Sequence, residues 1–208
     1  MNADRPSDDN THYFSENPHA ESAECEYHFT FDDATIRIVS DRGVFSMNGL
    51  DKGTATLMNH LSDADAPLPP GVIVDLGCGA GPLTIALAKR FPARTVWGVD
   101  VNARALELTV RNARLNNVPN VKTCTPDTFP EIAVAAIWSN PPIRIGKDAL
   151  HQMLSAWLKR LERRGQCRIV VNKNLGGDSL QRWLVSEGFL CARLASKSGF
   201  RIFEVSHP

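Results

Sequence analysis

Asn140, Pro141 and Pro142 follow an apolar run, VAAIWS at 134–139, and form the segment with the clearest chemical potential. Two consecutive prolines remove two backbone donors and fix two φ angles, and the first of them pushes Asn140 out of the helical region. The result is a rigid, extended corner whose carbonyl oxygens lack neighbouring N–H groups. Gly, Asp or Asn would make a simple turn more easily, whereas this corner holds hydrogen-bond acceptors still. We therefore expect its oxygens to accept hydrogen bonds from a bound group.

The second chemical motif is a glycine-rich loop, DLGCGAG at 75–81. Gly77, Gly79 and Gly81 allow the backbone to turn tightly and to approach a ligand beside a helix N-terminus, although strand-to-helix turns also use glycine for structural reasons alone. The next predicted strand ends on Asp100, whose carboxylate can accept both hydroxyls of a ribose. Together these residues predict a nucleoside site.

The spacing of this loop distinguishes between cofactors. A dinucleotide loop has the pattern G-x-G-x-x-G, whereas here Pro82 follows Gly81. Asp75 ends the first strand, where it would repel a pyrophosphate but can pair with a cationic amino group. An amino acid joined to a nucleoside satisfies both conditions, so the loop predicts S-adenosylmethionine rather than NAD.

Predicted strands and helices alternate around these motifs from residue 72 onward. This alternation predicts an α/β fold with a doubly wound, mostly parallel sheet. Only Lys197-Ser198-Gly199 separates the last two strands, so the last strand must be antiparallel. The predicted strands span 72–77, 95–100, 121–124, 134–139, 167–172, 189–196 and 200–206, and the predicted helices span 81–91, 103–117, 147–165 (closed by Gly165) and 178–188.

The N-terminal third precedes this alternating region. We interpret residues 1–24 as an arm and residues 25–208 as one domain, made of an extension (25–70) and a core (71–208). Alternating apolar and polar residues at 26–40, around Asp32-Asp33, predict a hairpin, and residues 53–61 fit a short helix.

The motifs occur in an order typical of a known family. VIVDLGCGAG at 72–81, GVD at 98–100 and SNPPI at 139–143 resemble class I S-adenosylmethionine-dependent methyltransferases, over about residues 12–208. The resemblance implies a seven-stranded, Rossmann-like sheet, with the glycine loop on the methionine part of the cofactor, Asp100 on the ribose and Asp127 near the adenine amino group. The implied cofactor-binding residues of the core are Asp75, Gly77, Cys78, Gly79, Gly81, Asp100, Val101, Asp127 and Thr128.

In that family an Asn-Pro-Pro-aromatic corner marks the members that methylate planar nitrogens. The lone pair of such a nitrogen is delocalised, which makes it a poor nucleophile. The Asn140 side-chain oxygen and the Pro141 carbonyl can accept both of its N–H hydrogens, which concentrates electron density on the nitrogen and aims it at the methyl group. Asn140, Pro141, Pro142 and Ile143 are therefore the implied catalytic residues. Ile143 replaces the usual aromatic residue, so a ring that stacks on the target must come from elsewhere, from Phe200 or an N-terminal aromatic residue.

Longer matching segments indicate one branch of this family. HYFSENP at 12–18, GVFSMNGLDKGT at 43–54, NPPIRIGK at 140–147 and GFRIFEV at 199–205 are similar to small-subunit ribosomal RNA guanine-N2 methyltransferases. In that branch the LDKGT segment packs near the cofactor, which implies contacts by Lys52, Gly53 and Thr54. Some members carry a second, degenerate copy of the domain. With one copy, this chain is expected to recognise ribosomal RNA or the small ribosomal subunit through its arm, hairpin and basic C-terminal half.

Charge is distributed unevenly along a chain whose formal net charge is zero. Residues 1–69 carry 4 basic and 13 acidic side chains, whereas residues 140–208 carry 12 basic and 5 acidic ones. Basic side chains beyond the Asn-Pro-Pro corner suit an anionic substrate, although a solvated basic face is the simpler interpretation of any one of them. The candidate phosphate contacts are Arg144, Lys147, Lys173 and Arg201.

Composition excludes several other classes. No run approaches the roughly 18 apolar residues of a membrane span, and the polar, acidic start predicts no signal peptide. The five cysteines are scattered without a C-x-x-C pair. They favour neither a disulfide framework nor a metal site and suggest a reducing cytoplasm. The oligomeric state and the methylated nucleotide are left open.

Three alternatives remain at the level of sequence. Glutamine-N5 methylation of a protein uses the same corner chemistry, usually with Tyr at the position of Ile143. A cofactor- or RNA-binding module without catalysis is a second alternative. The presence of Asp75, Asp100 and Asn140 argues against it. An NAD oxidoreductase is the third.

Overall fold

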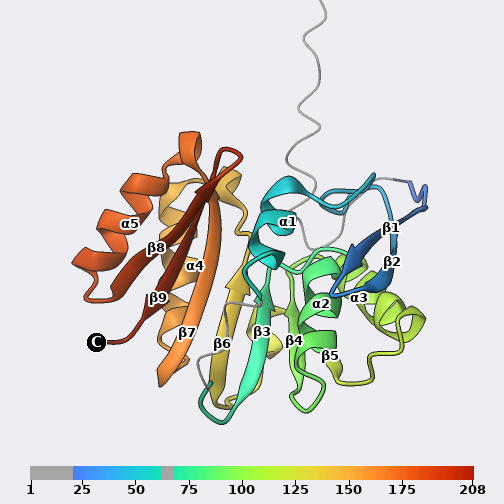
Figure 1. The fold of residues 1–208 in the computed structure, drawn as a ribbon, viewed down its shortest axis with the longest axis horizontal. Coiled ribbons are helices and arrows are strands. Elements are labelled where there is room, and N and C mark those ends of the chain that lie inside the picture. Colours follow the sequence, from blue (N-terminus) through green and yellow to red (C-terminus); the bar gives the residue numbers. More distant parts are fainter. Residues whose placement is uncertain (1–20, 62–67) are drawn as a thin grey trace, which may run out of the picture.

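Seven strands form one twisted sheet in the computed structural model, which describes residues 21–61 and 68–208 (Figure 1). The strand order is β5-β4-β3-β6-β7-β9-β8, and β9 is antiparallel to both of its neighbours whereas the other pairs are parallel. The predicted doubly wound sheet with an antiparallel last strand is therefore confirmed. Its strands are β3 (Val72–Leu76), β4 (Val96–Val99), β5 (Val121–Cys124), β6 (Val134–Ser139), β7 (Leu161–Asn172), β8 (Leu190–Lys197) and β9 (Phe200–Ser206).

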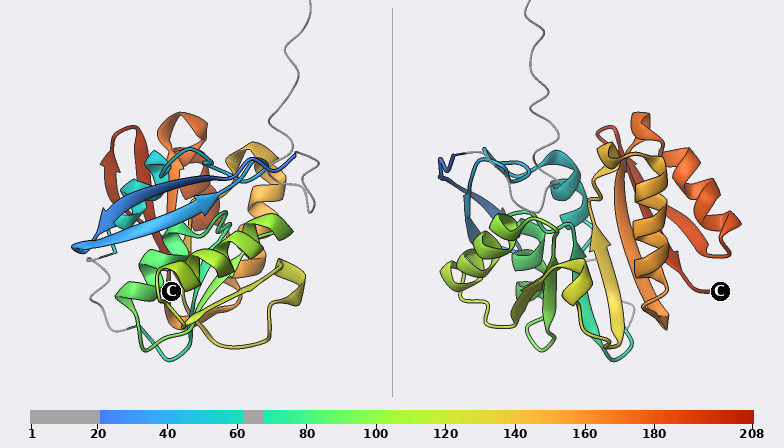
Figure 2. Two further views of the ribbon diagram at one scale, coloured as in Figure 1. Left: turned by 90° about the vertical axis from the view of Figure 1, so that its right-hand side faces the viewer. Right: turned by 180° about the vertical axis from the view of Figure 1, so that it is seen from behind.

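Helices cover both faces of the sheet (Figure 2). Ile73 on β3 packs in the core cluster that contains residues of the first three helices, and the next residue, Val74, packs in the cluster that contains residues of the last two. Because both faces are covered, a central strand such as β6 is buried at every position and reads as a continuous apolar run. The helices are α1 (Lys52–Met58), α2 (Pro82–Arg90), α3 (Ala103–Leu115), α4 (Lys147–Leu158) and α5 (Gly177–Ser186).

One predicted boundary is wrong. The predicted helix 147–165 ends at Leu158, and the residues from Leu161 onward belong to β7. Leu161 continues the apolar spacing of α4, so the local pattern does not separate the two elements. Strand pairing separates them, because Leu161 lies opposite Val134 on β6. The register of this pair of strands then shifts between Val134 and Ala136, which accommodates the extra residues of β7.

The predicted hairpin is present as β1 (Cys25–Phe31) and β2 (Ala34–Ser40), which pair antiparallel. Its turn residues, Asp32 and Asp33, have φ values of 46° and 60°. Two consecutive residues with positive φ match the right-handed twist of a hairpin, and Asp tolerates this conformation better than most residues.

Two asparagines of α3 anchor the hairpin to the core. Asn112 accepts a hydrogen bond from the Val39 N–H (2.9 Å) and donates one to the Val39 carbonyl (2.8 Å), and Asn116 makes the same pair of bonds with Arg37 (3.0 and 2.7 Å). Side-chain amides thus satisfy the backbone groups of the β2 edge. Asn102 adds a hydrogen bond to the Gly43 carbonyl (2.7 Å). These contacts hold the loop between β2 and α1 at the carboxyl ends of β3 and β4, where it takes part in the site.

Candidate functional site

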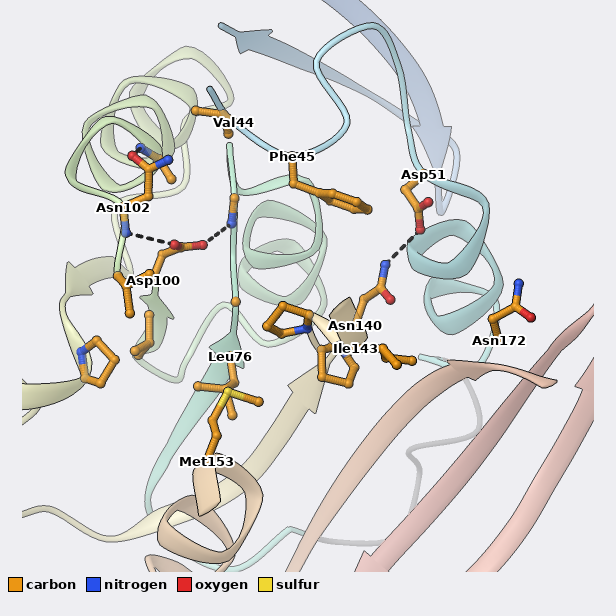
Figure 3. Close-up of a pocket in the computed structure, with 18 of the residues that line it drawn as sticks. Val44, Phe45, Asp51, Leu76, Asp100, Asn102, Asn140, Ile143, Met153 and Asn172 are labelled. Atoms are coloured by element: carbon orange, nitrogen blue, oxygen red, sulfur yellow. Dashed lines mark hydrogen bonds between the residues drawn. The ribbon is translucent and has the colours of Figure 1, made fainter. Parts of the chain in front are cut away.

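A cavity of about 290 Å³ lies where β3, β4 and β6 end (Figure 3). Open parallel sheets bind ligands at this edge, outside the carboxyl ends of the strands. Asp100 lies at one end of the cavity and Asn140 at the other, with apolar side chains such as Leu76 and Met153 between them. A smaller adjoining cavity lies against the glycine loop. The site is therefore long and amphipathic, with an acidic end and an amide end.

The glycine loop contributes backbone to the cavity at Gly77 and Gly79, but not at Gly81. A Cβ at Gly79 (φ 55°) would have no neighbour nearer than the Phe45 carbonyl oxygen at 3.9 Å, so the positive φ, rather than crowding, requires glycine here. A Cβ at Gly81 would lie 2.7 Å from the Thr109 hydroxyl. Gly81 therefore lets α2 pack against α3, and it lines neither cavity.

Asp100 is held rigidly beside this loop. One of its carboxylate oxygens accepts a hydrogen bond from the Gly79 N–H (2.9 Å) and the other from the Asn102 N–H (3.0 Å), as Figure 3 shows. Burial raises the pKa of Asp100, and the N–H groups of Asn102 and Gly79 oppose that shift. Each oxygen keeps lone-pair capacity for a hydroxyl donor in the cavity. The neighbouring Val101 also lines the cavity and is 39% exposed.

Asp75 is buried at the end of β3 and lines the smaller cavity together with Cys78. The Thr84 hydroxyl donates a hydrogen bond to its carboxylate at 2.6 Å. Burial raises the pKa of Asp75 to about 7, the Thr84 hydrogen bond opposes the rise, and the charge of Asp100 adds to it. A cation placed in this cavity would stabilise the ionised form of Asp75.

The Asn-Pro-Pro corner forms the other end of the cavity, with Asn140, Pro141, Pro142 and Ile143 all in its wall. The Asn140 side-chain nitrogen donates hydrogen bonds to an Asp51 carboxylate oxygen (2.8 Å) and to the Thr54 hydroxyl (3.0 Å). Both hydrogens of the amide are thus engaged, and its oxygen remains as an acceptor.

Two aromatic residues also line the cavity, Phe45 from the loop after β2 and Phe200 from the first position of β9. Phe200 lies opposite Asn172, the last residue of β7, which is a further lining residue. Figure 3 shows Phe45 between the Asp100 and Asn140 ends. The structure therefore supplies aromatic surface that Ile143 lacks, from Phe200, which was predicted by name, and from Phe45, which was not.

Several predicted cofactor contacts do not line the larger cavity. Asp127 and Thr128 are exposed, and Pro126 of the same turn lines the cavity instead. Lys52 is exposed at the start of α1. A Cβ at Gly53 would lie 3.3 Å from the Asn140 side-chain nitrogen. Gly53 and Thr54 therefore lie against Asn140, and Thr54 also lines the smaller cavity with Asp75.

The predicted phosphate contacts differ in their surroundings. Lys147 and Lys173 are exposed, at the start of α4 and just beyond the end of β7. The Arg201 side chain is only 16% exposed and forms an ion pair with Asp178, so it serves packing and charge balance on α5 rather than an open surface. The side chain of Arg144 lies outside the described part of the structure, as do the residues of the predicted arm before Glu21.

Asp51 is the main residue that sequence reasoning missed. Its role as the helix cap could have been predicted, since Asp-x-x-Thr before an apolar helix is a capping pattern. Its contact with Asn140 has no local signal. Phe45 and Asn172 were missed as well, because their place in the wall depends on how the loop after β2 and the end of β7 are positioned.

Residues 21–61 and 68–208 contain no candidate metal centre and no candidate membrane-spanning helix. Within these ranges no three His, Cys, Asp or Glu side chains are grouped so that they could hold a metal ion. None of the helices described there is long and apolar enough to cross a bilayer.

Comparison with known proteins gives a consistent picture. The family described as "Methyltransferase small domain" matches residues 35–204. The Bacillus subtilis (strain 168) protein YbxB, described as uncharacterized, is 36% identical over 172 residues, which covers 81% of this chain and 84% of YbxB. The ribosomal RNA small subunit methyltransferase C of Stutzerimonas stutzeri (strain A1501) is 35% identical over 185 residues, which covers 85% of this chain. The chain spans about half of that relative, 53% of its length.

Solved structures share the fold at lower sequence identity. The 16S rRNA N2 G1207 methyltransferase (RsmC) of T. thermophilus, solved in complex with AdoMet and guanosine, superposes with a TM-score of 0.74 at 20% identity, covering 90% of this chain and 52% of that one. A ribosomal protein L11 methylase from Lactobacillus delbrueckii subsp. bulgaricus superposes with a TM-score of 0.62 at 19% identity, covering 76% of this chain and 80% of that one.

Proposed function

The chain belongs to the methyltransferase small domain family, and on this basis we propose that it transfers the methyl group of S-adenosylmethionine to the exocyclic N2 of a guanine in small-subunit ribosomal RNA. The observation that carries the proposal is the arrangement of the cavity: Asp100 and the Asn-Pro-Pro corner lie at its two ends, and the glycine loop also lines it. A relative named as a ribosomal RNA small subunit methyltransferase supports the choice of substrate.

The acidic end of the cavity suits the cofactor. The fixed Asp100 carboxylate would accept the ribose hydroxyls, and the open backbone at Gly77 and Gly79 leaves room for the methionine part. The buried Asp75 carboxylate, at the smaller cavity, would pair with the cationic amino group. When bound, S-adenosylmethionine supplies an electrophilic methyl group on a positively charged sulfur.

The amide end suits a planar amine. The Asn140 oxygen and the Pro141 carbonyl would each accept one hydrogen of the guanine amino group, which localises the nitrogen lone pair and points it along the cavity. The prolines restrict the backbone, so little reorganisation accompanies the reaction. The nitrogen lone pair forms the bond to the methyl carbon, the carbon–sulfur bond breaks with its electron pair left on sulfur, and the methylated nitrogen then gives one proton to water. Proximity and these two acceptors supply the catalysis, without a covalent nucleophile.

Phe200 is the proposed stacking partner of the target base. Ile143 offers dispersion contact but no aromatic face, whereas Phe200 lines the amide end of the cavity and contacts the first turn of α1 near Gly53. Phe45, which touches both the larger and the smaller cavity, is proposed to cover the cofactor instead. Lys147 and Lys173 follow the strands that end at this part of the site and are proposed to contact phosphate groups of the RNA.

The direct test is transfer of a labelled methyl group to ribosomal RNA from a strain that lacks the corresponding gene, followed by nucleoside analysis. Free RNA and assembled small subunits are supplied in separate reactions. The expected product is N2-methylguanosine, formed by the native protein and much more slowly by Asn140→Ala. Label in a glutamine-containing peptide instead would move the substrate to protein, and binding of the cofactor without any transfer would indicate a non-catalytic module.

A further inference from the structure

The side-chain amide of Asn140 has its two hydrogens fully engaged by residues that lie more than 80 positions earlier in the chain. Its nitrogen is 2.8 Å from an Asp51 carboxylate oxygen and 3.0 Å from the Thr54 hydroxyl oxygen. A primary amide nitrogen carries two hydrogens and accepts none. The opposite orientation of the amide would place its oxygen against the Asp51 carboxylate, where two acceptors repel.

We propose that Asp51 and Thr54 are positioning residues that hold the Asn140 amide in the one orientation that turns its oxygen toward the target nitrogen. The inference rests on the proposed function and adds to the catalytic site two residues that lie outside the sheet. An amide rotated by half a turn would present hydrogens to the hydrogens of the substrate and could not activate it. The hydrogen bonds from Asn140 thus convert an ambiguous side chain into a fixed acceptor.

The first turn of α1 is built for this contact. The carboxylate oxygen of Asp51 that accepts from Asn140 also accepts the Thr54 N–H (2.9 Å), so the helix cap and the amide share one atom. Gly53 lies between them, and a Cβ there would be 2.9 Å from that Asp51 oxygen and 3.3 Å from the Asn140 nitrogen. A side chain at position 53 would therefore push into the contact.

Burial makes the Thr54 hydroxyl difficult to replace by water. Thr54 is 6% exposed, and it faces Asn140 from the helix side. Thr56, two residues later, offers a matched comparison. It is similarly buried, at 8%, but its hydroxyl donates to the Lys52 carbonyl within the same helix (2.7 Å). Replacing either threonine by valine removes one buried hydroxyl from α1. Only Thr54→Val removes a hydrogen-bond partner of Asn140.

The first experiment compares Thr54→Val, Thr54→Ser and Thr56→Val in single-turnover methylation of the RNA substrate. Thr54→Val is expected to lower the rate constant by roughly 10- to 100-fold, the scale of a misplaced reacting group. The KM for RNA should stay within about twofold of the native value, because transfer depends on the amide orientation and RNA binding does not. The rates are compared at saturating cofactor, since Thr54 also lines the smaller cavity. Thr54→Ser should restore the rate, and Thr56→Val should leave it unchanged. Equal rates for Thr54→Val and Thr56→Val would overturn the inference.

A double-mutant cycle separates positioning from other effects. In the Asn140→Ala background, Thr54→Val should cause no further loss of rate, because Thr54 acts only through the amide. A further loss of the same size as in the native background would overturn the inference while leaving the proposed function intact. Full turnover by Asn140→Ala alone would instead remove the proposed chemistry, and the role of Thr54 and Asp51 with it.

Asp51 provides the second arm of the test. Asp51→Asn keeps an oxygen that can accept from both Thr54 and Asn140, whereas Asp51→Ala removes the helix cap and the amide contact together. We expect Asp51→Asn to keep most of the rate and Asp51→Ala to lose it, with a lower Tm for Asp51→Ala. A folded Asp51→Ala protein with the native rate would contradict the proposal. Because the threonine variants keep the cap, the test stands even where Asp51→Ala fails to fold.

Discussion

Asp51 and Asn140 are joined by a 2.8 Å hydrogen bond across 89 residues of sequence. The bond connects the first turn of α1, in the N-terminal extension, to the corner that follows β6. The extension is therefore part of the site itself and does more than enlarge the protein surface. Its hairpin is fixed to α3 by Asn112 and Asn116, so α1 and the loop before it are held from two sides.

Loss of the Asp100 carboxylate should weaken cofactor binding. Asp100→Ala removes the acceptor proposed for the ribose hydroxyls, and one lost charged hydrogen-bonding group costs about 1.5–3 kcal/mol. Calorimetric titration with S-adenosylmethionine or its demethylated product measures the change. Glu107→Ala, an exposed acidic residue on α3, is the control for net charge. Unchanged affinity in Asp100→Ala would remove Asp100 from the site.

Cofactor affinity should rise with pH through neutrality. Burial raises the pKa of Asp75 to about 7, so below that pH the free protein carries a protonated Asp75 that must ionise before it can pair with a cation. Binding is then accompanied by proton release between about pH 6 and 8, which titrations in buffers of different ionisation enthalpy detect. Asp75→Asn should bind more weakly at high pH and lose this pH dependence. An identical pH profile in the variant would assign the dependence to another group.

The same shift predicts a pH-dependent stability. The pKa of Asp75 is higher in the folded protein than its ordinary value of 3.8, so its contribution to stability is fully present in acid. That contribution is lost as the pH rises from about 4 to about 7, because the folded state then holds a buried charge. Asp75→Asn, which keeps an oxygen for the Thr84 hydroxyl, should therefore raise the Tm more at pH 8 than at pH 5. A larger gain at pH 5 would contradict the assignment.

Removal of the Phe200 ring should weaken the reaction on RNA. Base stacking on an aromatic side chain contributes about 1–3 kcal/mol per base, so Phe200→Ala should lower kcat/KM by roughly 5- to 150-fold, and Phe200→Tyr should restore it. Phe45→Ala should instead weaken cofactor binding, since Phe45 lies against both cavities. Steady-state kinetics and cofactor titration of the two variants distinguish these roles. The reverse assignment would follow if only Phe45→Ala raised the KM for RNA.

The salt dependence of RNA binding tests the lysines. If Lys147 and Lys173 each contact a phosphate, the double alanine variant should reduce the slope of log K against log salt by about 1.4–1.8 units. Lys159 and Arg163, exposed where α4 ends and β7 begins, are at the end of β7 remote from Asn172 and serve as the matched double control. Equal slopes for both double variants would mean that the basic surface acts without a defined contact.

A methyl group at Gly53 should slow catalysis without unfolding the protein. A Cβ there would lie 2.9 Å from the Asp51 carboxylate and 3.0 Å from the Phe200 ring, so both side chains must shift. Gly177, in the first turn of α5, is the control, because a Cβ there meets its nearest neighbour, Arg201, at an ordinary 3.4 Å. Both Gly→Ala variants should keep or raise the Tm through helix propensity. Only Gly53→Ala should lose turnover, and equal turnover in the two would contradict the crowding argument.

The sequence alone determined most of the architecture of this protein. The strands, the hairpin with its Asp32-Asp33 turn and the antiparallel last strand follow from apolar periodicity and turn chemistry, which act over a few residues. The glycine loop, Asp100 and the Asn-Pro-Pro corner were also predictable as parts of one site. Each ends a parallel strand, and the carboxyl ends of parallel strands meet at one edge of the sheet.

Only the tertiary structure decided the remaining features. Leu161 fits the helical spacing of α4, and its pairing with Val134 makes it a strand residue. Arg201 reads as an available cation, and its burial against Asp178 makes it a packed ion pair. Asp51 reads as a helix cap, and its second partner, Asn140, is brought to it by the fold. In each case the deciding contact is with a residue distant in the chain, which local periodicity and capping patterns do not encode.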